Sequence, residues 1–145
     1  MFRRDTPAET EFRMDLRNWL EANLPAALRG RTTRPLPAEL MPWYHTLSRK
    51  GWIAPHWPKQ YGGMGATLNE QIVMTEELAR VDAPHLPVQG LNHIGPILME
   101  FASDAQKAQH LPPIIEGSVI WAQGYSEPGA GSDLASLTTR AILDG

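Results

Sequence analysis

The sequence contains no cysteine, and this absence removes several kinds of chemistry at once. Without a thiol, the chain has no disulfide staple, no thiolate nucleophile and no cysteine-ligated zinc or iron–sulfur cluster. The five histidines are scattered and do not have the spacing of metal ligands. We therefore expect neither a metal site nor covalent cysteine chemistry.

Long apolar runs and a strong charge of one sign are missing as well. No stretch approaches the roughly 18 apolar residues of a membrane-spanning helix, and the N-terminal residues lack the apolar segment of a signal peptide. The net charge is −3, with acidic and basic residues interspersed, so no basic face for nucleic acid is indicated. We expect a cytoplasmic protein with no membrane span and no nucleic-acid partner.

The helical signals are strong and begin near the N-terminus. Three capping boxes, in which Thr or Ser precedes Glu or Gln by three residues, predict helix starts at Thr6, Thr67 and Ser103. Apolar residues at helical spacing follow the first of these starts, up to Pro25: Phe12, Leu16, Trp19, Leu20 and Leu24. The chain is therefore predicted to be all-α, an antiparallel bundle of four to six helices between residues 6 and 116, with a short strand near residues 118–123.

Two more helices are predicted from apolar spacing alone. Their stripes are Leu40, Trp43, Tyr44 and Leu47, closed by Gly51, and Leu91, Ile94, Leu98 and Phe101, interrupted by Gly90 and Gly95. An interior glycine costs about 1 kcal/mol, so something is expected to need the space beside the backbone. The helix that starts at Ser103 is expected to stop at Pro112, where two prolines are adjacent.

Glutamates cluster on the helix that follows Thr67, at Glu70, Glu76 and Glu77. Paired carboxylates suit acid–base or di-metal chemistry, but a di-iron bundle needs Glu-x-x-His repeats, which do not occur here. We expect exposed helix charges. The stretch of residues 51–65 has too many aromatic residues for a solvated loop and too many prolines and glycines for a helix, so it is expected to pack against the core.

The most informative stretch is residues 121–140, WAQGYSEPGAGSDLASLTTR. An apolar run passes here into a loop in which Gly124, Gly129 and Gly131 free the backbone and Pro128 stiffens it. The glycine spacing fits neither the dinucleotide fingerprint G-x-G-x-x-G nor the phosphate loop G-x-x-x-x-G-K-[ST]. Such a loop is typical of a turn, and it also suits close approach of a flat ligand with polar edges.

The whole string Y-S-E-P-G-A-G-S-D-L-A-S-L, with W-A-Q-G before it and T-T-R-A after it, resembles the flavin-binding signature of the acyl-CoA dehydrogenase family. Two earlier segments resemble the same family: G-W-x-x-P-x-W-P with Y-G-G-x-G, and F-x-S-x-x-Q-K-x-x-x-L-P-P-I-x-x-G. The resemblance covers nearly the whole chain from Gly51. It implies that residues 1–117 are the N-terminal helical domain and that residues 118–145 begin the middle β-domain.

The resemblance also implies a function and a site. The family uses FAD to remove two hydrogens across the α,β carbons of an acyl-CoA thioester, passes electrons to electron-transferring flavoprotein or a similar acceptor, and forms homo- or hetero-oligomers, dimers or tetramers. The resemblance places the flavin against Gln123, Gly124, Tyr125, Ser126, Glu127, Pro128, Gly129, Ala130, Gly131 and Ser132. Ser126 would contact the pyrimidine edge, Ser132 would also contact the pantetheine arm, and the substrate contacts would include Gln89, Gly90 and Ile94.

The sequence stops before the family's C-terminal domain, which carries the glutamate base. No catalytic residue is therefore predicted here, and the chain alone is expected to be inactive, as a fragment of a longer enzyme or as a truncated partner subunit. Two alternatives stay open: a related flavoprotein, such as an acyl-CoA oxidase or flavin monooxygenase, and a non-catalytic helical interaction module.

Overall fold

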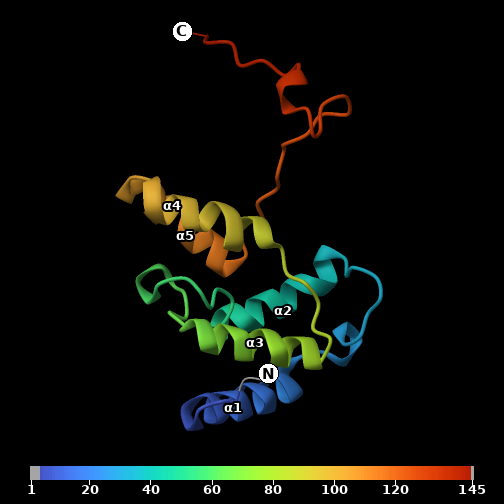
Figure 1. The fold of residues 1–145 in the computed structure, drawn as a ribbon, viewed down its shortest axis with the longest axis vertical. Coiled ribbons are helices and arrows are strands. Elements are labelled where there is room, and N and C mark those ends of the chain that lie inside the picture. Colours follow the sequence, from blue (N-terminus) through green and yellow to red (C-terminus); the bar gives the residue numbers. More distant parts are fainter. Residues whose placement is uncertain (1–3, 145) are drawn as a thin grey trace.

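The computed structural model describes residues 4–144, and Figure 1 shows that this part of the chain is helical. Its α-helices are α1 (Pro7–Asn23), α2 (Pro37–Lys50), α3 (Leu68–Arg80), α4 (Gly95–Phe101) and α5 (Asp104–Glu116). Short 3₁₀ turns lie at Ala26–Leu28 (η1), Lys59–Tyr61 (η2) and Leu134–Ser136 (η4), and a π-helical turn, η3 (Gln89–Ile94), leads into α4. The predicted all-α class is confirmed.

All three predicted capping boxes are present. At the first, Thr6 Oγ1 accepts the backbone N–H of Glu9 at 3.3 Å, and the Glu9 carboxylate accepts the N–H of Thr6 at 2.9 Å. The boxes at Thr67 and Ser103 make the same reciprocal pair of bonds. Each box satisfies two backbone donors that a helix start leaves free, so these boundaries are fixed locally.

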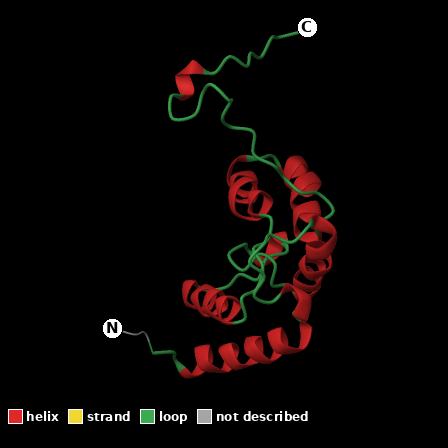
Figure 2. Ribbon diagram, turned by 90° about the vertical axis from the view of Figure 1, so that its right-hand side faces the viewer, coloured by secondary structure: helices red, strands yellow, loops and turns green. Residues whose placement is uncertain are grey.

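The helices pack pairwise, α1 against α3 and α4 against α5, with α2 also contacting α5. The Tyr44 hydroxyl ties α2 to α5, because it donates to the Ile114 carbonyl at 2.6 Å in the core. After α5 the chain leaves the helices and extends away from them in both Figure 1 and Figure 2. None of the helices in this described part is both long and apolar enough to cross a membrane.

The aromatic loop after α2 packs into the core around Trp57, whose side chain is fully buried. The backbones of Gly63 and Gly95 lie directly against it: a Cβ on Gly95 would come within 2.0 Å of the indole ring, and one on Gly63 within 2.2 Å of the Trp57 carbonyl oxygen. The space beside the interior glycine Gly95 is therefore required by Trp57.

The π-helical turn supplies the acceptor that holds this indole. Gly95 donates its N–H to the Gly90 carbonyl five residues back, and the next donor in that pattern would be Pro96, which has no N–H. The Leu91 carbonyl is bonded from the side instead, by Trp57 Nε1 at 2.7 Å, with His56 Nε2 at 3.2 Å. The loop at 51–66 and the turn before α4 thus complete each other's hydrogen bonding.

Two predicted elements are wrong. Helix α5 continues through Pro112 and Pro113 to Glu116. The N–H groups that the prolines lack would have bonded the carbonyls of Ala108 and Gln109, and water can reach these two residues because they are exposed. The burial of Leu111 and Ile114 favours the helix. The strand expected at 118–123 does not form within residues 4–144, because no other segment there pairs with it. Phe101, expected in the buried stripe, is 81% exposed.

Glu77 also differs from the expectation of an exposed charge, since its side chain is 2% exposed. Its carboxylate accepts hydrogen bonds from Arg17 at 2.7 and 2.9 Å, from Arg80 at 2.7 Å and from Arg13 at 3.2 Å. These guanidinium groups, with Arg17 first, lower the pKa of Glu77 to about 2. The carboxylate therefore fastens α1 to α3.

Replacing Glu77 with glutamine is expected to reduce the free energy of unfolding by about 3 kcal/mol at neutral pH, because the buried Glu77 carboxylate is the shared charge partner of Arg13, Arg17 and Arg80. Since the folded-state pKa lies below the usual Glu value, this stabilisation is present above about pH 4.5 and is lost as the pH falls toward about 2. Urea unfolding at neutral and acidic pH measures both effects.

The control is Glu76→Gln, because the Glu76 side chain is 54% exposed and forms an ion pair with Arg13 at the surface. An exposed pair is worth about 1 kcal/mol or less. Equal destabilisation by the two substitutions would show that the buried position of Glu77 has no special importance.

Candidate functional site

The glycine-containing loop predicted to bind a cofactor has a defined turn at its centre. Glu127 and Ala130 exchange backbone hydrogen bonds of 3.0 Å in both directions, which makes Pro128 and Gly129 the two residues of a tight turn. Ala130 is buried. The loop is thus ordered by its own hydrogen bonds, although it lies apart from the helices.

Glu127 ties this turn to the chain that follows it. Its carboxylate accepts the backbone N–H groups of Thr138 at 2.9 Å and Thr139 at 2.7 Å, and both threonine hydroxyls as well. These bonds, with the Thr139 hydroxyl first, lower the pKa of Glu127 to about 2. The two threonines received no role in the sequence analysis, although their T-T pair belongs to the string that carries the resemblance.

Three glycines of this loop face open space. A Cβ placed on Gly124, Gly129 or Gly131 would meet no other atom of the described chain within 4 Å, and none of the three has a positive φ. Neither backbone conformation nor packing inside the chain therefore requires glycine there. This is the opposite of Gly63 and Gly95, which are enclosed by Trp57.

Three of the residues predicted to contact substrate, Gln89, Gly90 and Ile94, lie on η3. A Cβ on Gly90 would meet Ile114 Cγ2 at 3.0 Å and Trp121 Cδ1 at 3.4 Å, so the space beside Gly90 is filled from within the chain. Ile94 is half-buried and packs on the core. Within the described residues, η3 and the loop of residues 123–132 are not brought together: Trp121 touches η3, and the loop beyond it extends away (Figure 2).

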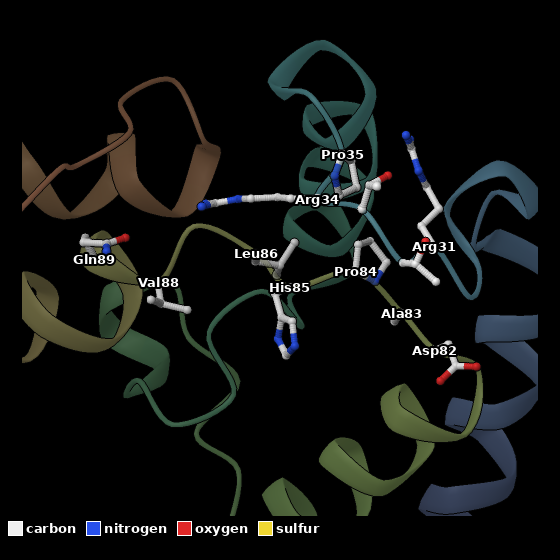
Figure 3. A pocket seen from close by; sticks show the side chains of 12 residues that line it. Arg31, Arg34, Pro35, Asp82, Ala83, Pro84, His85, Leu86, Val88 and Gln89 are labelled. Atoms are coloured by element: carbon white, nitrogen blue, oxygen red, sulfur yellow. The ribbon is translucent and has the colours of Figure 1, made fainter.

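Gln89 lines a recess of about 650 Å³ between two loops, residues 31–35 before α2 and residues 82–89 before and at the start of η3. Figure 3 shows the side chain of Arg34 reaching toward the end of the recess where Val88 and Gln89 lie. Asp82 and Arg31 lie at the opposite end. Sequence reasoning missed the arginines, because they lie more than fifty residues before Gln89 in a polar connection that carries no motif.

These helices define a known class of domain. Residues 6–118 match the family description "Acyl-CoA dehydrogenase, N-terminal domain". The chain therefore belongs to the acyl-CoA dehydrogenase family, and the predicted resemblance is confirmed.

Relatives of known name agree with this assignment. Acyl-CoA dehydrogenase IpdE1 of Mycobacterium tuberculosis is 40% identical over 147 residues, which cover 93% of this chain and 37% of that protein. Acyl-CoA dehydrogenase FadE26 of the same organism is 44% identical over 99 residues, 68% of this chain and 24% of that protein. The chain thus spans little more than a third of the length of these relatives at most.

Solved structures show the same fold. The ChsE4-ChsE5 complex from Mycobacterium tuberculosis matches with a TM-score of 0.81 at 36% identity, over 100% of this chain and 37% of that one. The Tcur3481-Tcur3483 steroid ACAD matches with a TM-score of 0.79 at 38% identity, over 100% and 38%. The helical architecture is therefore that of the family's N-terminal domain.

Proposed function

We propose that this chain is the N-terminal part of an FAD-dependent acyl-CoA dehydrogenase that removes two hydrogens across the α,β carbons of an acyl-CoA thioester. The observation that carries the proposal is the set of glycines that nothing in the chain requires, Gly124, Gly129 and Gly131. Each leaves a strip of backbone open to close approach, as a flat cofactor needs. The surrounding string resembles the family's flavin-binding signature, and the family match of residues 6–118 supports FAD as the cofactor that fits.

The polar groups of the loop suit this cofactor. Ser126 and Ser132 are exposed, and no hydrogen bond within the described chain occupies either hydroxyl. The Ser126 hydroxyl and backbone N–H would donate to the pyrimidine edge of the flavin, where negative charge accumulates on reduction, and Ser132 would hold the pantetheine arm of the substrate as well. When bound, FAD supplies the acceptor for hydride from the β-carbon. The remaining residues of 123–132 would form the wall against which it lies.

Glu127 acts on the shape of the site in this proposal. With four donors on its carboxylate it fixes the turn against Thr138 and Thr139, and its lowered pKa makes it a weak proton acceptor. Glu77 has a similarly lowered pKa and is enclosed by arginines, and Glu70 caps α3. We propose that the base that takes the α-proton comes from another part of the protein or from a partner subunit.

Assembly with further chain or subunits is part of the same proposal. Exposed apolar side chains lie on α4 and along the extended tail: Ile97, Phe101, Tyr125, Ile142 and Leu143. They would be covered by other domains or subunits, and a solved structure that shares this fold is itself a complex. The similarity to a protein named a steroid ACAD favours a bulky acyl group over a straight fatty acyl chain.

The experiment uses the protein at its native length, purified with any partner chain and mixed anaerobically with acyl-CoA substrates. We expect it to carry flavin and the visible flavin absorbance to bleach when acyl-CoA is added, because the substrate reduces the cofactor. An electron-transferring flavoprotein should then restore the absorbance faster than oxygen does. Fast recovery with oxygen would favour an acyl-CoA oxidase, and a colourless protein would favour the interaction module.

A further inference from the structure

The recess beside Gln89 carries a positive charge that the chain does not neutralise. Arg31 and Arg34 both line it, together with the polar side chains of Thr32, Thr33 and His85. Arg31 is already committed, since its guanidinium pairs with Glu39 at 2.9 Å. No acidic partner is recorded for Arg34 anywhere in residues 4–144, which makes it the free cation of the recess.

The position of Arg34 relative to Gln89 gives the recess a direction. The Arg34 side chain extends toward Val88 and Gln89, while the only carboxylate that lines the recess, Asp82, lies at the far end (Figure 3). A guanidinium and an amide at one end offer several N–H donors to a single oxygen-bearing group. Leu86 and Val88 supply apolar surface beside them. A volume of about 650 Å³ is in the range of small-molecule sites.

We propose that Arg34 recognises an anionic oxygen, a carboxylate, at the end of the acyl group that is remote from the thioester. This inference rests on the proposed function, in which Gln89 lies beside the acyl group. The substrate class is then an acyl-CoA whose acyl part carries its own carboxylate, and Arg34 sets specificity without contacting the reacting carbons. A plain hydrocarbon end would leave the guanidinium without a partner and gain less from this recess.

The test compares two acyl-CoA ligands of equal length, one ending in a carboxylate and one in a methyl group, on the native-length protein with its partner chains. Binding is measured by calorimetry. Activity is measured as the kcat/KM for each acyl-CoA in complete turnover with an electron acceptor. We expect the carboxylate-ended ligand to bind more tightly, and Arg34→Gln to weaken its binding by about tenfold or more with little change for the methyl-ended ligand. Arg49→Gln is the matched control, because Arg49 is an exposed arginine at the end of α2 that does not line the recess, and its expected change is below about threefold.

Each result separates this inference from the proposed function. Equal binding of the two ligands, or equal effects of Arg34→Gln on both, would overturn the role of Arg34 even if both ligands bleach the flavin. Selective loss of carboxylate-ended binding without any flavin reduction would support the role of Arg34 and contradict the dehydrogenase proposal. Absence of binding by either ligand would overturn both.

Discussion

Replacing Gly131 with valine is expected to abolish flavin retention while the helices stay folded. The substitution adds a branched side chain whose Cβ would meet no atom of the described chain within 4 Å beyond the adjacent residues, and φ there is not positive, so the chain itself should tolerate it. The added atoms fill the space that the proposed flavin would occupy. Flavin absorbance per protein, with far-ultraviolet circular dichroism for the helices, measures both outcomes in the native-length protein.

The matched control is Ala105→Val on the exposed surface of α5, which adds the same branched side chain away from the loop. This variant should keep the flavin content per chain of the unchanged protein and nearly the same free energy of unfolding. A Gly131→Val protein that purified with one flavin per chain would show that the cofactor binds somewhere other than residues 123–132.

Replacing Trp57 with alanine is expected to cost about 3–5 kcal/mol of unfolding free energy, which is a large part of the total stability of about 5–15 kcal/mol of an ordinary domain. The indole is fully buried, lies directly against Gly95, and donates to the Leu91 carbonyl. Its removal therefore leaves a large cavity and weakens the link between the aromatic loop and the π-helical turn. Urea unfolding followed by circular dichroism gives the difference.

Phe101→Ala serves as the comparison for Trp57, since it removes an aromatic ring that is 81% exposed. It should change the stability by about 0.5 kcal/mol or less. A similar loss for both variants would mean that the packing around Trp57 does not carry the stability assigned to it.

The parts of the fold that could be predicted are those that depend on neighbouring residues. A capping box closes within three residues, so the starts at Thr6, Thr67 and Ser103 were predictable from short strings. The end of α2 at Gly51 is equally local, because its φ of 77° favours glycine. Helical periodicity predicted four to six helices, and five α-helices lie in the part of the chain that the structure describes.

The errors arose where distant residues decide. Glu77 looks like a solvent-facing helix charge until Arg17 and Arg13, 60 and 64 residues away, close around it. Pro112 and Pro113 have no N–H for the helix, yet the burial of Leu111 and Ile114 outweighs that local rule in α5. A strand at 118–123 needs a partner strand, and a stretch of sequence does not by itself supply one.

The candidate site shows the same division. The string around Gly129 identified the family, but it gave no geometry. The role of Glu127 in binding the Thr138 and Thr139 N–H groups depends on the loop folding back over eleven and twelve residues. The recess at Arg34 depends on two connections that have neither periodicity nor a motif, so only the folded chain brings Arg34 and Gln89 to one cavity.

The most direct test of the central claim is amide hydrogen exchange of the native-length protein with and without FAD. The proposed site lies in a loop whose backbone is exposed, so its N–H groups should exchange quickly in the free protein. Bound FAD is predicted to slow exchange across residues 123–132, with the helices α1 to α3 unchanged. Unchanged exchange in this loop on saturation with FAD would contradict the account.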